Sequence, residues 1–179
     1  MKKVVIIFGL ISGLIVAVMV WLNTWLMVSG QISYDRAEIV GYASMLIALT
    51  MVFFGIKSYR DNYAGGRITF WKGVQVGLLI TLISGVLYFV GAETYSLAHP
   101  GFVDNFIQRA SEQTETRLHE KQATQAEIDK SLAEIVQMKG LLQNPVIFFF
   151  ICLIEILPVG IVVTLISAGL LRRKELLPV

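Results

Sequence analysis

Four long apolar stretches divide the chain, and each is long enough to cross a membrane. They cover about residues 4–28, 39–56, 73–92 and 146–171. The hydrocarbon core of a bilayer is about 30 Å thick, which about 20 apolar residues cross as a helix. Lipid offers the backbone no hydrogen-bond partners, so each stretch must be helical. The pattern predicts an all-α polytopic membrane protein, with residues 1–179 forming a single four-helix membrane domain.

The first stretch also resembles a secretory signal peptide. Lys2 and Lys3 precede it, and Val28, Ser29 and Gly30 are small enough to be a cleavage site. A signal-peptide apolar region is usually about 7–15 residues long, however, and this one is much longer. We therefore expect an uncleaved first membrane helix.

The segment of residues 99–144 carries a different pattern. Its apolar residues recur at helical spacing, first from Phe102 and again from Ile128. Thr124 and Glu127 have the spacing of a capping box, and Asn144-Pro145 marks the end of the segment. We expect a helical hairpin that turns near residues 122–124. Its apolar faces either pack on each other and on the membrane surface or form a docking surface for another protein.

Composition supports a membrane protein. Hydrophobic residues make up 55% of the chain and charged residues 16%, against about 45–50% and 25% in soluble domains. These values exclude a soluble globular domain, a disordered chain and a fibrous protein. The single cysteine, Cys152, excludes an intramolecular disulfide and a cysteine-based metal cluster. Motifs of the GxSxG and HExxH kinds are absent, so we predict no enzyme, no cofactor and no metal site.

The distribution of charge predicts an orientation. Basic residues gather at the N-terminus, in the loop of residues 57–72 and at residues 172–174, whereas the loop of residues 93–145 has more acids than bases. Lys and Arg favour the cytoplasmic side. Both termini and the loop of residues 57–72 are therefore expected in the cytoplasm. The long loop 93–145 is then periplasmic if the protein lies in a bacterial inner membrane.

Several short motifs resemble those of a known family. The run Gly55-Ile56-Lys57-Ser58-Tyr59-Arg60-Asp61-Asn62 is followed by Gly65-Gly66 and by Gly73 and Gly77. With Phe8-Gly9 near the start and Pro158-Val159-Gly160 near the end, the whole chain resembles the DUF4199 family of bacterial membrane proteins, common in Bacteroidetes-type organisms. The resemblance implies four membrane helices with a helical insert before the last. It implies no activity and no site residues.

Glu155 is the one charged residue inside a predicted span. A carboxylate at mid-bilayer is costly and is a functional hypothesis by default. Ser84 and Tyr88 fall at similar depth in the third span and are candidate hydrogen-bond donors, and Pro158 can free a carbonyl beside the acid. We expect Glu155 to be partly or wholly protonated at neutral pH, because burial disfavours the charged form. It is either an interhelical latch, a proton or ion site, or a contact for a lipid headgroup or partner helix.

The second loop mixes basic and aromatic residues. Arg60, Asp61, Arg67 and Lys72 stand there with Trp71. This is the usual interfacial anchoring pattern. It is also compatible with a site for anionic lipid phosphates or for a cytoplasmic partner. Gly65-Gly66 lacks the lysine and hydroxyl residue of a phosphate-binding loop, and the basic residues are too dispersed for nucleic acid.

Small residues recur at helical spacing in three of the spans. Gly9 and Gly13, Gly73 and Gly77, and the series Gly160, Thr164 and Ala168 permit close helix approach, either within the bundle or between copies of the chain.

Two functions follow from these patterns. The first is a non-enzymatic accessory or scaffolding subunit of a membrane complex, which uses the helical insert as its docking surface and contacts lipids and a membrane-protein partner or a second copy. The alternative is an oligomeric small transporter or proton-coupled module that uses Glu155. An intramembrane enzyme acting on lipid ranks last.

Overall fold

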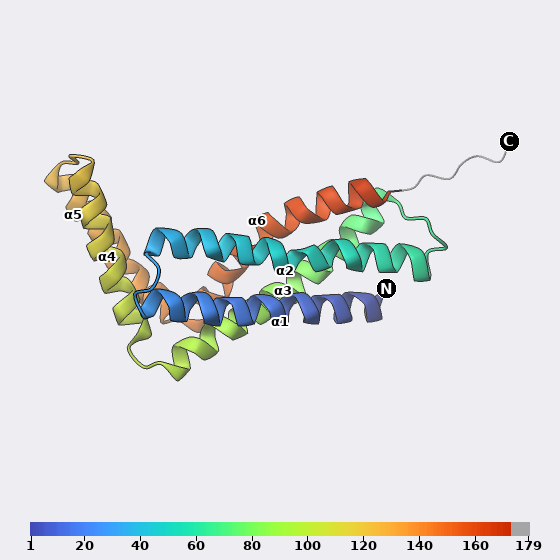
Figure 1. Ribbon diagram of the computed structural model, residues 1–179, viewed down its shortest axis with the longest axis horizontal. Coiled ribbons are helices and arrows are strands. Elements are labelled where there is room, and N and C mark those ends of the chain that lie inside the picture. Colours follow the sequence, from blue (N-terminus) through green and yellow to red (C-terminus); the bar gives the residue numbers. More distant parts are fainter. Residues whose placement is uncertain (173–179) are drawn as a thin grey trace.

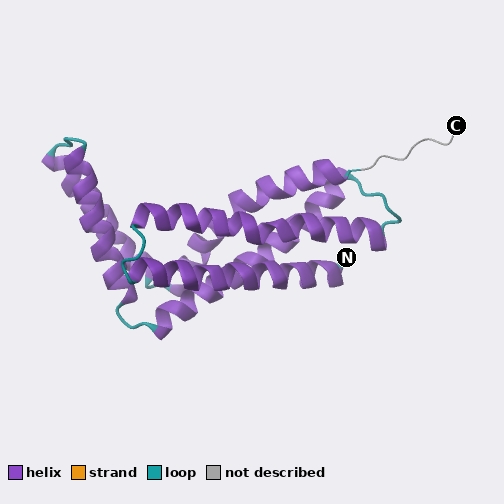
Figure 2. Cartoon of the chain, in the orientation of Figure 1, coloured by secondary structure: helices purple, strands orange, loops and turns teal. Residues whose placement is uncertain are grey.

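The computed structural model describes residues 1–172, without the side chains of Tyr34 and Asp35. Helices account for nearly all of this part, which contains no strand (Figure 2). The six are α1 (Lys2–Val28), α2 (Tyr34–Tyr63), α3 (Phe70–Ala98), α4 (Phe102–Glu120), α5 (Gln125–Leu142) and α6 (Pro145–Leu171). Four of them, α1, α2, α3 and α6, are long and apolar enough to cross a membrane. Of the predicted C-terminal basic cluster, Arg173 and Lys174 lie outside the described residues.

The membrane helices are longer than the apolar stretches that mark them. Residues 39–56 are apolar, but α2 runs over 30 residues from Tyr34 to Tyr63. At 1.5 Å per residue it is about 45 Å long, which exceeds the hydrocarbon core by several turns. The polar residues at its ends continue the helix because they lie beyond the lipid tails. Hydropathy alone therefore locates α1 and α6 closely but marks only the middle of α2 and α3.

Helices α1, α2, α3 and α6 form a bundle in which α1 packs along α2 and α3, and α6 packs along α3 and α2. The start of α1, the turn between α2 and α3, and the end of α6 lie together at one end of the bundle (Figure 1). We call this the basic end, because it carries Lys2, Lys57, Arg67 and Arg172. Helices α4 and α5 form a hairpin at the opposite end, which we call the hairpin end.

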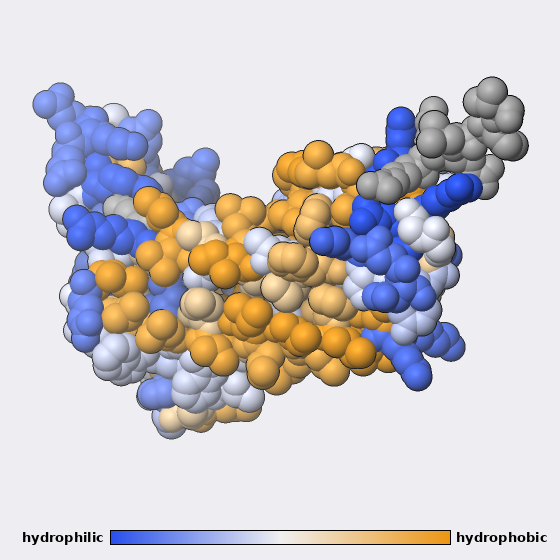
Figure 3. All heavy atoms as spheres, turned by 45° about the vertical axis from the view of Figure 1, so that its right-hand side comes forward, coloured by the Kyte–Doolittle hydropathy of each residue, from blue (hydrophilic) through white to orange (hydrophobic). Residues whose placement is uncertain are grey.

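On the face of the bundle that Figure 3 shows, a hydrophobic belt lies between two polar ends. Its side chains include Leu14, Ile154 and Leu170, which are 65%, 70% and 73% exposed. Exposed aliphatic side chains of this kind are costly in water but favourable in lipid. The belt therefore supports a chain that lies in a membrane.

Glycines bring the helices of the bundle close together. A Cβ on Gly160 would collide with the side chain of Thr81 on α3, and one on Gly77 would collide with Thr164 on α6. Gly9 and Gly13 of α1 meet Ile83 and Leu87 of α3 in the same way. Each predicted small-residue motif thus contacts a helix of the same chain. Close approach of this kind is how membrane helices gain packing energy.

The hairpin between α3 and α6 turns through residues 121–124. The backbone N–H of Thr124 donates to the Glu127 carboxylate over 2.8 Å, which is one half of the predicted capping box. This hydrogen bond lowers the pKa of the Glu127 carboxyl. At the other end, Asn144 Oδ1 accepts from the backbone N–H groups of Val146 and Ile147 at 3.0 and 3.3 Å and so caps α6.

Three contacts fix the base of the hairpin. Arg109 Nη1 donates to the carbonyl oxygen of Met27, in the last turn of α1, over 3.0 Å. Within the hairpin, Lys139 Nζ lies 2.6 Å from Asp104 Oδ1. The ring of Phe102 packs edge-on against Tyr95, with 5.2 Å between the centroids. The hairpin is therefore joined to both α1 and α3 as well as to its neighbour in sequence, α6.

Candidate functional site

Glu155 and Tyr88 join α6 to α3 near the middle of the bundle. The Tyr88 hydroxyl donates to Glu155 Oε2 over 2.6 Å. Glu155 lies ten residues after Pro145, the first residue of α6, which corresponds to about 15 Å along the helix axis. That is about half the thickness of the hydrocarbon core. The structure therefore brings together two of the residues that the sequence singled out, at mid-membrane depth.

Ser84, the other candidate donor, does not reach the carboxyl group. It is fully buried, and its hydroxyl donates to the carbonyl oxygen of Ile80 in its own helix over 2.9 Å. Thr81 makes the same kind of bond, to Gly77. Such back-bonding satisfies a hydroxyl locally and removes it from interhelical contacts. Hydropathy and depth could not separate Ser84 from Tyr88, because both lie at similar levels of α3.

Pro158 lies within α6, three residues after Glu155, and the helix continues on both sides of it. Proline has no backbone N–H, so the carbonyl of Ile154 lacks its usual helical donor. The carbonyl group without a donor therefore belongs to the residue that precedes Glu155 in the sequence. Because α6 is unbroken from Pro145 to Leu171, Pro158 does not split it into the half-helices that form ion sites in many transporters.

A cavity of about 300 Å³ occupies the hairpin half of the bundle, and Glu155 and Tyr88 belong to its lining. We call it the outer cavity. Its walls are mainly apolar residues of the membrane helices, such as Val20, Met45 and Ile151. The hairpin also lines it, through Phe102, Val103, Phe106, Met138 and Leu142. The sequence did not predict this cavity, because a gap between helices depends on how they cross.

The charged residues of the outer cavity are both acidic. Two carboxyl residues, Glu38 and Glu155, line it, and no Lys, Arg or His does among the described residues. The amide nitrogen of Asn23 donates to the carbonyl of Ala37 over 3.0 Å, while its oxygen is buried without a partner. Tyr42 and Ser44 add hydroxyl groups from α2.

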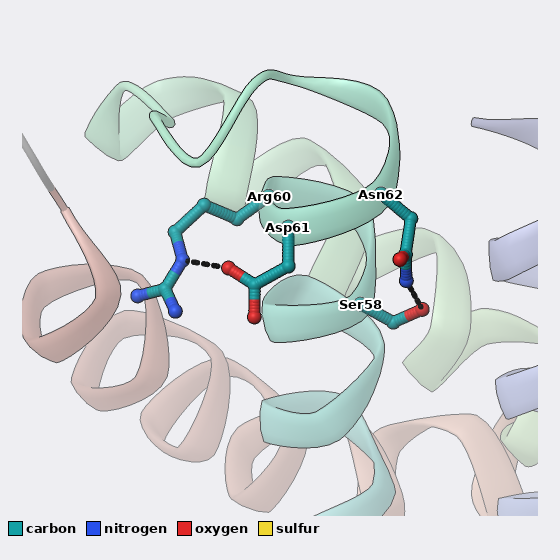
Figure 4. A network of polar contacts seen from close by, with 4 residues as sticks. All are labelled: Ser58, Arg60, Asp61 and Asn62. Atoms are coloured by element: carbon teal, nitrogen blue, oxygen red, sulfur yellow. Dashed lines mark hydrogen bonds and ion pairs between the residues drawn. The ribbon is translucent and has the colours of Figure 1, made fainter.

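The predicted site in the second loop is organised as an ion pair. Arg60 Nε donates to Asp61 Oδ1 over 2.6 Å, and Asn62 donates to Ser58 beside it (Figure 4). The Arg60 side chain is only 13% exposed. Because Asp61 occupies the Nε of Arg60, that guanidinium has fewer donors left for an external phosphate.

The other two residues predicted in that loop lie at the start of α3. Lys72 Nζ donates to Gln75 Oε1 over 2.9 Å, and its backbone N–H is capped by the Thr69 hydroxyl at 3.3 Å. Arg67 lies just before the cap and is exposed. Trp71 is 76% exposed at this level, as an interfacial anchor would be. The arrangement fits anchoring, and a contact with anionic lipid stays a prediction.

Within residues 1–172, no three His, Cys, Asp or Glu side chains gather as a metal site would require. Cys152 is buried and free. His99 lies at the end of α3, where its Nδ1 is 3.0 Å from the carbonyl of Tyr95 and its ring stacks on the Tyr95 ring at 4.2 Å. This histidine therefore belongs to the aromatic cluster beneath the hairpin.

The comparisons with known proteins gave one match. A family model described as "Protein of unknown function (DUF4199)" matches residues 7–173, nearly the whole chain. No curated protein and no solved structure matches.

Proposed function

Since the chain belongs to the DUF4199 family, for which no function is assigned, we propose a role from its geometry. It is a non-enzymatic integral membrane protein, an accessory or scaffolding subunit that uses its hairpin as a docking surface for another membrane protein. The observation that carries this proposal is the attachment of the hairpin. A docking surface has to be held in a fixed orientation, and the hairpin is held from three sides.

The attachment combines a long-range contact with α1, a local contact with α3 and an ion pair within the hairpin. Arg109 reaches the last turn of α1 across 82 residues, where the guanidinium meets the negative end of the helix dipole. Phe102 packs on Tyr95, and Lys139 pairs with Asp104. Pre-ordering of this kind reduces the conformational entropy that docking would otherwise cost.

Apolar side chains on α5 supply a surface for contact. Val136, Met138 and Leu141 are 58%, 42% and 44% exposed, and they lead toward Val146 at the start of α6, which is 64% exposed. The surrounding hairpin carries seven acidic and five basic residues between residues 102 and 142. Apolar residues within a charged surface are typical of the centre of a protein interface. The partner would carry an apolar ridge with basic residues at its edge.

Purification in mild detergent, followed by identification of co-purifying proteins, tests this role. Val136→Asp and Leu141→Asp place a charge on the proposed surface and should release the partner. Gln137→Asp is the matched control, because it adds the same charge at an exposed position that is already polar. A partner that is retained equally by all three variants, or the recovery of no stoichiometric partner, would contradict the proposal.

We further propose that the protein lies in a bacterial inner membrane with the basic end in the cytoplasm and the hairpin in the periplasm. The balance of charge supports this orientation, because Lys and Arg outnumber Asp and Glu at the basic end, whereas the hairpin carries more acidic than basic residues. In a Cys152→Ala background, a membrane-impermeant maleimide should label Ser111→Cys on the hairpin in intact spheroplasts. It should label Ser58→Cys, near the basic end, only after the membrane is opened. The reverse labelling pattern would show that the protein has the opposite orientation in the membrane.

A second candidate is an oligomeric small transporter or proton-coupled module, and the Tyr88–Glu155 pair at mid-membrane depth favours it. Against it, the half of the bundle toward the basic end is tightly packed. Ile80, Thr81 and Thr164 are fully buried there. A path through one chain would have to pass these residues, so transport requires an oligomer. A proton leak in proteoliposomes that disappears in Glu155→Gln would support this candidate over the first.

A further inference from the structure

We propose that the outer cavity binds a hydrophobic amine, an apolar molecule whose ammonium group pairs with the carboxylate of Glu155. This goes beyond a docking role for the hairpin, because it assigns a small-molecule site to the membrane part of the chain. The site combines one carboxyl group near mid-membrane, apolar walls and a hairpin that closes the cavity on one side.

The charge of the cavity selects a cation. Glu38 and Glu155 line it, and the part of the chain that the structure describes places no Lys, Arg or His in the lining. In a medium of low dielectric constant, a carboxylate without a cationic neighbour attracts a positive charge strongly. A carboxylic acid would instead meet two like charges, and an alcohol would gain a hydrogen bond without ion pairing.

The hydrogen bonds of Glu155 leave room for a ligand. Tyr88 donates to Oε2, and Oε1 accepts no hydrogen bond from a described residue. A carboxylate has about four lone-pair sites, and an ammonium brings three donors. Asn23 Oδ1, which is buried and has no partner, is a further acceptor in the same lining. An unsatisfied buried acceptor such as Asn23 Oδ1 is costly, and a ligand that donates a hydrogen bond would satisfy it.

The walls accommodate the apolar part of such a molecule. Val16, Met19, Met45 and Phe148 surround the cavity within the bundle, and Phe106 lines it from the hairpin. A volume of about 300 Å³ is at the lower end of the range of small-molecule sites. Aminophospholipids carry an amine too, but their phosphate would require a basic residue that the described lining lacks. The cavity therefore favours an amine without an anionic group.

Binding to three probes with the same ten-carbon tail tests the inference: decylamine, decanol and decanoate. The full chain is reconstituted in phosphatidylcholine nanodiscs, which contain no primary amine, and isothermal titration is corrected with empty nanodiscs. We expect saturable binding of decylamine, with affinity lower by about tenfold or more for decanol and for decanoate. A second titration in nanodiscs that contain phosphatidylethanolamine tests the lipid as the source of the amine, because a bound lipid would compete with decylamine.

Glu155→Gln should weaken decylamine binding by about tenfold or more. Glu93→Gln removes the same charge from α3 outside the cavity lining and should leave the affinity unchanged. If Glu155→Gln fails to fold, Ala92→Leu keeps the carboxyl group and narrows the cavity, and it should also abolish binding. Equal affinity for decylamine and decanol, or unchanged binding in Glu155→Gln and Ala92→Leu, would overturn the inference. Neither result depends on whether the hairpin binds a partner protein.

Discussion

The two halves of the bundle differ in how their helices meet. Toward the basic end, Gly77 and Gly160 let α3 and α6 approach so closely that no Cβ fits between them. Toward the hairpin end, the four membrane helices together line the outer cavity. The first half is a packed core, in which Thr81 and Ser84 donate to carbonyl groups of their own helix. The second half keeps Tyr88, Asn23 and Glu155 at a gap.

The difference shows how one bundle can provide both stability and a site. Small residues stabilise membrane helices through packing, which the basic half uses fully. The hairpin half gives up part of this packing, and contacts outside the membrane helices hold it together instead. Arg109 and Phe102 supply such contacts from the hairpin. A binding site can therefore open without loss of the fold, and this comparison can be tested by substitution in each half.

The largest effect is expected in the packed half. Gly160→Val would drive a branched side chain into Thr81, and we expect a loss of about 2–3 kcal/mol in the free energy of unfolding. Denaturation in detergent micelles measures it. Gly169→Val is the control on the same helix, since nothing lies within 4 Å of that position. Similar losses in both variants would show that packing against α3 is not what makes Gly160 important.

At the edge of the cavity, Tyr88→Phe removes one hydrogen bond without changing the packing. The interaction joins α3 to α6 over 2.6 Å, and interhelical hydrogen bonds in membranes contribute about 0.6–1.7 kcal/mol. A double-mutant cycle with Glu155→Met, which removes the acceptor, isolates the coupling between the two side chains. A coupling free energy near zero would mean that the bond contributes nothing to holding the open half together.

Within the hairpin, Arg109→Gln should loosen the contact with α1. The bond to Met27 is exposed, so we expect about 0.5–1 kcal/mol. Hydrogen exchange should become faster in α4 while the packed half stays protected. Arg117→Gln, two turns further along α4, is the comparison variant, because its side chain makes no hydrogen bond or ion pair with another described residue. Equal hydrogen-exchange rates in α4 of the two variants would show that Arg109 does not help to attach the hairpin.

The smallest effect concerns the tip of the hairpin and depends on pH. The backbone N–H of Thr124 lowers the pKa of the Glu127 carboxyl below its ordinary value of 4.5. A lowered pKa in the folded state stabilises the hairpin above pH 4.5, and this contribution is lost as the pH falls through the lowered value. Amide exchange in the first turn of α5 should then accelerate in acid. Glu127→Gln retains a capping acceptor and should lose the pH dependence.

The sequence predicted the parts of the fold that depend on local chemistry. Apolar runs located the four membrane helices, and Thr124 with Glu127 located the start of α5. Asn144 and Pro145 marked the start of α6. These features are set by residues close together along the chain, where hydrogen bonding and burial act on a single helix. The ends of α2 and α3 extended further than the apolar runs, because polar residues continue a helix outside lipid.

The candidate site was less accessible to sequence reasoning. Glu155 was evident because a charge within an apolar span is rare, and depth suggested Tyr88. Depth also suggested Ser84, which bonds to Ile80 instead. Asn23 and Glu38 lie on α1 and α2 and join the site only through the cavity that these helices line together with α3 and α6. Crossing geometry of this kind depends on pairs of distant residues, so no single span could reveal it.

The short junction between α5 and α6 has a mechanical consequence. Only Gln143 and Asn144 separate the two helices, and Asn144 is fixed to the first turn of α6 by two hydrogen bonds. The hairpin is therefore coupled directly to α6, the helix that carries Glu155. A force applied at the tip of the hairpin would turn α6. It would at the same time shift Phe106, a hairpin residue that lines the outer cavity. If a partner holds the hairpin and an amine occupies the cavity, each must change the affinity for the other by the same factor.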